Sequence, residues 1–348
     1  MWVERPLVRR CLRSTTAEDW LVGRQWMRRQ HARLTARRIY RNFGWPRQLC
    51  GLVCPQGERS LHVLEHLKRL TKVNYVTWMM DDHLLRFQEG RWQYPGNLRE
   101  TMRKHLRDAR AVFSISAALA EFYKKEFGVT SEVLVAPADY GCEPVWLSPS
   151  SGARCRLGYF GRLHAWQLDA LNRLVPLLRP ADCSLDIFCP AEDARDTLVA
   201  PGVCLRGWLP RKNVVAQMRT CDAVVLPISF AESDRNLCEF NVATKLSELL
   251  ASGTVILAVG PEYAAMTKLL QSAGAAQIVT NPGVPELARA AFCIKDTTHR
   301  RNLLVAACEL LRRDFSCVTM RDRWRSGLKA LNNRRLTLPP FNSSMHSD

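Results

Sequence analysis

The sequence predicts an α/β protein of two domains, each built on a parallel sheet. Short apolar runs alternate with amphipathic segments along most of the chain, and this is the pattern of strand–helix–strand units. A chain of 348 residues is longer than one core usually organises and suits two domains. The stretch PVWLSPSSG at 144–152 lies between the two sets of units, and its proline, serine and glycine content makes it the best candidate linker.

The first half begins with an arginine-rich segment that we expect to form one long helix. Trp20, Trp26, Leu34 and Ile39 supply its apolar positions. Strands and helices then alternate, and Ser116 is placed to cap the last helix of this half. The predicted helices cover 17–42, 60–70, 97–107 and 117–127, and the predicted strands cover 49–54, 73–79, 111–115 and 132–136.

The second half repeats the alternation and closes with two helices. Its predicted strands cover 155–160, 184–189, 203–207, 222–228, 255–259 and 276–279. Its predicted helices cover 168–178, 213–219, the segment KLSELLASG, 262–273, 285–291, 297–315 and 320–331. This order predicts a doubly wound sheet.

The segment from 222 to 260 contains a strand, a long polar loop, a helix and a second strand. In the helix, Leu246, Leu249 and Leu250 fall on one face, while Lys245 and Glu248 share the other. Gly253 stands where a left-handed C-cap is wanted. The loop leaves the carboxyl end of a strand, where open α/β sheets bind ligands, and a helix N-terminus there favours anions. An ordinary surface helix packed on a sheet is the alternative.

The same segment resembles the donor-binding segment of retaining GT-B glycosyltransferases of the family-4-like group. ATKLSELLASGTV at 243–255 lies over their P-x-K-x-x-E-Y-x-A-x-G-x-P-V pattern, and GYFGRL at 158–163 resembles the opening of their second domain. The chain departs from the family pattern at four positions. Ala243 replaces a proline, Leu249 a tyrosine and Gln167 a lysine, and the family's earlier acidic residue falls on Phe240.

The resemblance implies a GT-B fold, in which two facing Rossmann-like domains with parallel sheets hold a nucleotide sugar between them. It implies that the donor is bound by Gly161, Arg162, Thr244, Lys245 and Glu248. Glu248 would hold the ribose hydroxyls, since a carboxylate accepts two hydrogen bonds from a vicinal diol. Arg162 and Lys245 would steady the leaving diphosphate. In the polar loop, Arg235 and Asn236 either touch phosphate or stay solvated. Glu239, the neighbour of Phe240, is the third candidate residue of this donor loop.

The strand end WMMDDHL carries the candidate catalytic residues Asp81, Asp82 and His83. In GT-B enzymes a strand end of the first domain faces the acceptor, so these side chains are placed to orient an acceptor hydroxyl or accept its proton. The alternative is a structural cap, because Asp is common at such ends. We expect no metal here, because adjacent residues on an extended chain point in opposite directions.

The expected division is an acceptor-side domain at 1–145, a nucleotide-sugar domain at 153–315, a closing helix at 316–331 and a polar tail at 332–348. The strand and glycine-rich loop with which the family's first domain begins are not found. Either they lie upstream of Met1 or the first domain is reduced and non-catalytic.

The formal net charge of +17 calls for an anionic partner or a solvated surface. Twelve arginines against three acidic residues precede Gln48. An anionic membrane surface and a solvated helix face are the two leading interpretations of this charge, and no nucleic-acid motif accompanies it. The thirteen cysteines lack paired metal-site spacing and indicate free thiols in a reducing cytoplasm.

Together these features predict a cytoplasmic glycosyltransferase that acts in cell-surface polysaccharide or glycoconjugate synthesis. The membrane interpretation of the charge places it at the inner face of the membrane as a peripheral protein. It would move a sugar from a nucleotide-diphosphate sugar to a glycan, lipid-linked or other acceptor with retention, without a cofactor. The rival interpretations are a non-catalytic basic scaffolding protein on a decayed GT-B fold and a sugar-nucleotide epimerase. The sequence names neither the sugar, the base nor the acceptor.

Overall fold

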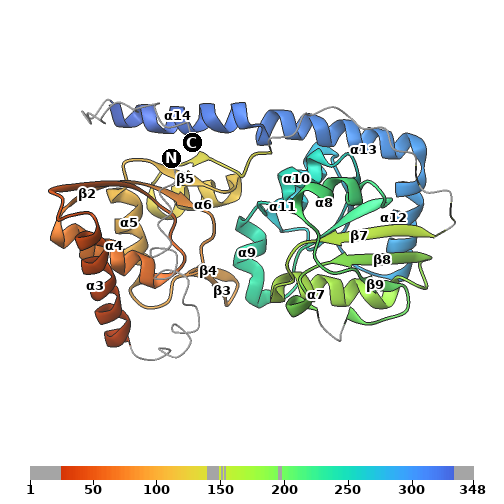
Figure 1. Cartoon of the computed structure of the whole chain (residues 1–348), viewed down its shortest axis with the longest axis horizontal. Coiled ribbons are helices and arrows are strands. Elements are labelled where there is room, and N and C mark those ends of the chain that lie inside the picture. Colours follow the sequence, from red (N-terminus) through yellow and green to blue (C-terminus); the bar gives the residue numbers. More distant parts are fainter. Residues whose placement is uncertain (1–24, 139–148, 150–151, 153, 195–197, 333–348) are drawn as a thin grey trace.

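Two parallel sheets lie side by side, each covered by helices (Figure 1). The computed structural model describes residues 25–138, 149, 152, 154–194 and 198–332. The start of the predicted arginine-rich helix, most of the candidate linker and the tail at 333–348 therefore lie outside the described residues. All pairings within the two sheets are parallel, and this confirms the predicted fold class.

The first sheet has the strand order β1-β2-β5-β6. Its strands are β1 (Gln48–Val53), β2 (Lys72–Met79), β5 (Val112–Ser114) and β6 (Glu132–Val133). The helices of this half are α3 (Gln25–Asn42), α4 (Glu58–Leu70), α5 (Leu98–Asp108) and α6 (Ala117–Phe127). As predicted, Ser116 caps α6, because its hydroxyl accepts the backbone N–H of Leu119 at 3.0 Å.

The second sheet has the order β12-β11-β10-β7-β8-β9. The chain starts in the middle at β7, winds to one edge, returns to β10 beside β7 and winds to the other edge. Its strands are β7 (Cys155–Phe160), β8 (Cys183–Phe188), β9 (Val203–Leu205), β10 (Ala223–Pro227), β11 (Val255–Val259) and β12 (Gln277–Val279). Such a doubly wound sheet binds ligands beyond the carboxyl ends of its central strands, here β7 and β10.

Helices cover both faces of this sheet and return to the first half. They are α7 (Ala165–Leu174), α8 (Arg211–Met218), α9 (Arg235–Phe240), α10 (Leu246–Ala251), α11 (Ala265–Ala273), α12 (Val284–Lys295), α13 (Thr297–Leu310) and α14 (Cys317–Asn332). α14 crosses back over the first sheet (Figure 1), where Trp324 stacks on Phe113 with ring centroids 4.7 Å apart.

Two elements were absent from the sequence prediction. The antiparallel hairpin of β3 (Arg86–Gln88) and β4 (Arg91–Gln93) has strands of three residues, which are too short for a periodic signal. Its turn is formed by Glu89 and Gly90, both with positive φ, as tight hairpin turns require. The other is α9, which lies within the segment predicted to be a polar loop.

α9 joins the two halves, because it belongs to the second half in sequence and packs on the first. The ring of Phe240, at its end, lies 4.8 Å from that of Trp92 and 5.0 Å from that of Phe122. The Ser116 hydroxyl also donates to the Phe240 carbonyl at 2.5 Å. Phe240 is 6% exposed. The GT-B pattern has an acidic residue at this position, whereas in this chain the side chain fills the core between the halves.

Phe240→Ala should lower the free energy of unfolding by about 3–5 kcal/mol, because it leaves a cavity among aromatic rings. Phe292→Ala is the matched control, since Phe292 on α12 is 77% exposed. Urea unfolding followed by circular dichroism measures both variants. Equal midpoints for the two would contradict the packing role of Phe240.

Candidate functional site

A cavity of about 560 Å³ lies between the two halves at the carboxyl end of β7. Met80, Asp81 and Ile115 line it from the first half, and the rest of its wall comes from the second. It therefore occupies the point where the strand order of the second sheet reverses, which is the ligand-binding crevice of doubly wound folds. We call it the cleft.

The turn after β7 forms one wall of the cleft. Gly161 has φ 131°, a conformation that side chains rarely adopt, and a Cβ there would lie 4.0 Å from the Lys245 amine. The next residue, Arg162, faces two carboxylates: its guanidinium lies 3.1 Å from Glu192 and 3.6 Å from Asp193. Arg162 is thus held in place, with part of its charge already neutralised.

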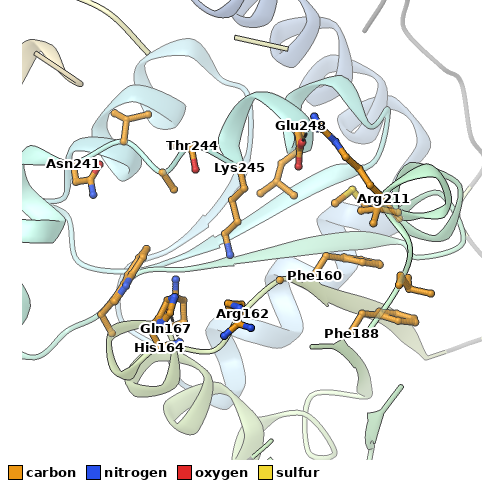
Figure 2. A pocket seen from close by; sticks show the side chains of 18 of the residues that line it. Phe160, Arg162, His164, Gln167, Phe188, Arg211, Asn241, Thr244, Lys245 and Glu248 are labelled. Atoms are coloured by element: carbon orange, nitrogen blue, oxygen red, sulfur yellow. Dashed lines mark hydrogen bonds and ion pairs between the residues drawn. The ribbon is translucent and has the colours of Figure 1, made fainter. Parts of the chain in front are cut away.

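Lys245 lies at the start of α10 and points toward the loop that carries Arg162 (Figure 2). Its amine donates to the Tyr159 hydroxyl at 3.3 Å and lies 4.5 Å above the ring of Tyr159. That hydroxyl donates in turn to the Arg162 carbonyl at 2.6 Å. Among the described residues Lys245 has no carboxylate partner, and burial lowers its pKa to about 8. The cleft therefore contains a cation that lacks a counter-ion.

Glu248 follows one turn later on the same side of α10 and also lines the cleft. Arg211, at the start of α8, lies 3.4 Å from its carboxylate. The Arg211 side chain is 85% exposed, so the pair is weak and open to exchange with a ligand. The buried leucines of α10 are the three that the sequence predicted, Leu246, Leu249 and Leu250. Their packing on the sheet fixes which side chains face the cleft.

Another part of the cleft wall is aromatic. Phe160 and Phe188 stack with ring centroids 4.7 Å apart and an interplanar angle of 7°. Trp208 lines the same cavity and is 61% exposed. Exposed aromatic surface beside charged groups is suited to a ligand with a planar ring at one end and anionic groups at the other.

The structure gives the three candidate catalytic residues different surroundings. Asp81 lines the cleft, and its carboxylate accepts a hydrogen bond from the Asn241 amide across the two halves. His83 lies 3.7 Å from that carboxylate but is not part of the cleft wall. Burial raises the pKa of Asp81, which makes this carboxyl group a better proton acceptor when ionised.

Asp82 faces the interior and not the cleft. Its carboxylate accepts the Tyr94 hydroxyl at 2.6 Å and the Tyr123 hydroxyl at 3.0 Å. The backbone N–H groups of Leu84 and Leu85 complete its partners at 3.1 and 3.2 Å. Asp82 is 3% exposed, so its surroundings match the structural cap that was the alternative interpretation.

The three residues of the predicted donor loop lie on α9 or at its start and do not line the cleft. Arg235 lies over the Phe87 ring at 3.6 Å and pairs with Glu239 at 3.0 Å. The Asn236 amide donates to the Asp82 carbonyl at 3.0 Å. In this structure Arg235, Asn236 and Glu239 hold the halves together, and none is placed to touch a ligand in the cleft.

All five residues predicted for donor binding line the cleft: Gly161, Arg162, Thr244, Lys245 and Glu248. Sequence reasoning missed Arg211, Trp208 and Asn241. The sequence predicts that α8 begins two residues after Arg211, and it places Asn241 in the polar loop, whereas Asn241 follows directly after α9 in the structure. Gln167, which replaces a lysine of the family, accepts the His164 backbone N–H at 2.9 Å and caps α7. Its side chain adds no charge to the cleft.

The described part of the chain contains no group of three His, Cys, Asp or Glu side chains arranged to hold a metal ion. None of its helices has the length and apolar content that crossing a bilayer demands.

Known structures share the fold of this chain, although no protein-family model and no curated protein matches its sequence. The sucrose-phosphate synthase of Thermosynechococcus elongatus aligns with a TM-score of 0.62 and 12% identity, over 88% of this chain and 78% of that one. HepE of Anabaena in complex with UDP-glucose aligns with a TM-score of 0.61 and 16% identity, over 85% and 82%. The lipopolysaccharide outer core galactosyltransferase WaaB aligns with a TM-score of 0.53 and 12% identity, over 88% and 82%. These alignments confirm the predicted GT-B fold.

Lys245→Met should stabilise the free protein at pH 7 by at most about 3 kcal/mol, the value that corresponds to the depressed pKa. The pKa is about 8 in the folded protein against an ordinary 10.5, so the unfolded chain binds more protons between these values. Wild-type stability should therefore rise with pH across that window, and the advantage of the variant should shrink there.

The control is Lys268→Met, which removes an exposed lysine of α11. Urea unfolding at several pH values compares the three proteins. A Lys245→Met variant that is less stable than Lys268→Met at pH 7 would contradict the conclusion that Lys245 lacks a counter-ion.

Proposed function

We propose that this protein transfers a sugar from a nucleotide-diphosphate sugar to an acceptor hydroxyl. The observation that carries the proposal is the Lys245 amine, a cation without a carboxylate partner among the described residues, in the cleft of a GT-B fold. A diphosphate would supply the missing negative charge. The structural neighbour HepE binds UDP-glucose, which is a ligand of this class.

The cleft offers a separate contact for each part of such a donor. Lys245 and Arg162 would meet the diphosphate, and Glu248 would accept hydrogen bonds from the ribose diol in place of its weak pair with Arg211. The base would lie against the aromatic wall that includes Trp208. α10 has only six residues, so its dipole contributes little, and the side-chain cations carry most of the stabilisation of the leaving group.

In the reaction, the bond between the sugar's anomeric carbon and the diphosphate oxygen breaks, and a bond to the acceptor oxygen forms. The diphosphate leaves with the electron pair of the broken bond. The acceptor loses its hydroxyl proton, and Asp81 is the carboxylate on the cleft wall that is placed to accept or orient it. Cations at the leaving group lower the barrier by stabilising charge that develops as the bond breaks. We expect retention of the anomeric configuration.

The contact that the family's earlier acid would make cannot come from Phe240, which is buried between the halves. Asn241 is the next residue, and it lines the cleft with its amide on Asp81. We propose that Asn241 and Asp81 bind the hydroxyls of the donor sugar, because together they offer both hydrogen-bond donors and acceptors. The Asn241–Asp81 pair would also bring the donor-side and acceptor-side halves into register.

The setting of the reaction is part of the proposal and is supported by sequence features alone. We place the protein in the cytoplasm, with a glycan or lipid-linked acceptor in surface-polysaccharide or glycoconjugate synthesis. An anionic membrane surface is the partner that we assign to the basic first half. The scheme assigns leaving-group stabilisation to protein cations and invokes no cofactor or metal.

Glu248→Ala should weaken binding of the preferred nucleotide sugar at least about tenfold, since hydrogen bonds to a charged group contribute about 1.5–3 kcal/mol each. Calorimetry with UDP-, GDP- and TDP-sugars measures the affinity. Glu262→Ala is the control, because Glu262 is exposed and does not line the cleft. Absence of binding to every nucleotide sugar would contradict the proposal and favour the scaffold, and conversion of the sugar without an acceptor would favour the epimerase.

Asp81→Asn should lower kcat by about a hundredfold, as is typical when a group that moves a proton is lost. Donor affinity should fall by much less than kcat, because the amide keeps the size of the carboxylate and its oxygen can still accept a hydrogen bond from Asn241 or a sugar hydroxyl. Glu89→Gln, on the exposed hairpin turn, is the control for loss of one charge. Turnover of the donor identified by calorimetry measures both variants, and an unchanged kcat in Asp81→Asn would remove Asp81 from the mechanism.

A further inference from the structure

A second cavity lies in the first half, between α3 and α4 and beside the first turn of α5. It has a volume of about 510 Å³ and adjoins a smaller one of about 350 Å³. These helices lie at the end of the molecule remote from β7 (Figure 1). The basic side chains that line the two cavities are Arg29, Arg33, Arg37, His62, His66, Arg69 and Lys104. We call this pair of cavities the basic groove.

The packing of α3 on α4 brings these charges together. The two helices meet through the small residues Ala32 and Ala36 against Val63 and Leu67. Arg29, Arg33 and Arg37 follow one another at intervals of four, which places them along one side of α3 next to this contact. Small contact residues let the two helices approach closely, so the arginines of α3 line the same groove as Arg69 of α4.

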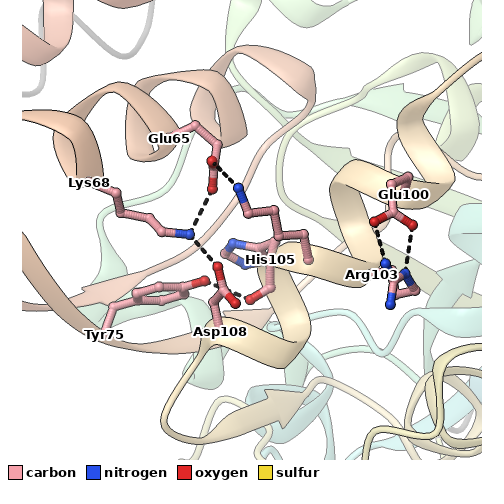
Figure 3. Close-up of polar contacts among 8 residues, drawn as sticks. Glu65, Lys68, Tyr75, Glu100, Arg103, His105 and Asp108 are labelled. Carbon is pink, nitrogen blue, oxygen red and sulfur yellow. Dashed lines mark hydrogen bonds and ion pairs between the residues drawn. The ribbon is translucent and has the colours of Figure 1, made fainter.

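The carboxylates of the groove are already engaged. Glu65 binds Lys68 at 2.8 Å and Lys104 at 2.9 Å, and Glu100 accepts both arms of Arg103 (Figure 3). Among the described residues no carboxylate pairs with Arg29, Arg33, Arg37 or Arg69. Like charges that line one groove repel one another, and a bound anion or added salt lowers this repulsion.

The lowered pKa of His66 is consistent with positive charge in the groove. This α4 residue lines both cavities of the groove. Burial and the neighbouring charge of Arg69 lower the pKa of His66, because a further positive charge is unfavourable there. The groove is therefore positive even with both histidines neutral.

From this arrangement we propose that the basic groove binds a phosphoryl group, at a site separate from the donor cleft. Guanidinium groups bind phosphate oxygens in two-pronged fashion, and several of them suit a group that carries more than one negative charge. A carboxylate would neutralise only one of the four arginines. The phosphoryl group comes either from a lipid headgroup or from a soluble phosphate compound, and both place the same chemistry in the groove.

The experiment compares two double variants of the full chain that remove the same charge. Arg33→Gln with Arg69→Gln changes two residues that line both cavities. Arg38→Gln with Lys125→Gln is the matched control, because both of these residues are exposed and neither lines the groove. Circular dichroism checks that all variants are folded. Calorimetry with inorganic pyrophosphate tests a soluble source, and sedimentation with phosphatidylcholine vesicles containing phosphatidic acid tests a lipid source.

The groove variant should lose at least about tenfold in affinity for one or both probes, while the control stays near wild type. Lys245→Met separates this site from the donor cleft, since it should leave groove binding intact. The proposal is overturned if groove variant and control bind both probes equally, or if Lys245→Met abolishes pyrophosphate binding and the groove variant does not. It is also overturned if wild type binds neither probe but binds duplex DNA in a manner that the groove variant abolishes.

Discussion

The contact between the end of β2 and α9 is the constraint on which the rest of the structure depends. Two consecutive carboxylates serve it in different ways. The Asp82 carboxylate points inward and accepts hydrogen bonds from two tyrosine hydroxyls and two backbone N–H groups. The Asp82 carbonyl accepts a hydrogen bond from the Asn236 amide. The Asp81 carboxylate faces the cleft and accepts a hydrogen bond from the Asn241 amide. Because side chains alternate along an extended chain, one short segment anchors the interface and also lines the site.

This anchoring has a consequence for the charges in the cleft. The halves are held together by hydrogen bonds and aromatic packing, so the carboxylates near the interface already have partners. Arg162 and Arg211 each have a carboxylate nearby, whereas the only partners of Lys245 in the described part of the chain are the ring and hydroxyl of Tyr159. A cation held without a counter-ion costs stability in the free protein and strengthens the binding of an anion. The basic groove is a second place where, among the described residues, several cations lack carboxylate partners.

Much of this arrangement follows from the sequence, and the remainder depends on contacts between distant segments. The six-residue strand β7 and the leucine face of α10 were predicted because apolar periodicity records burial directly. The Gly161 turn and Lys245 were found through motif spacing. By contrast, α9 has six residues, and its helical state depends on packing against Trp92 and Phe122, which lie far away in sequence. The different fates of Asp81 and Asp82 depend on Tyr94, Tyr123 and Asn241, and no local pattern reveals those partners.

The central claim is that burial lowers the pKa of the free Lys245 amine to about 8 and that a bound diphosphate raises this pKa again. The most direct test is the number of protons taken up when UDP binds, obtained by calorimetry in buffers of different ionisation heat. Lys245→Arg is the reference, because arginine keeps its charge at every accessible pH. At about pH 8.5 wild type should take up more protons than Lys245→Arg, and at about pH 6.5 the two should agree. Equal uptake by the two proteins at both pH values would contradict the account.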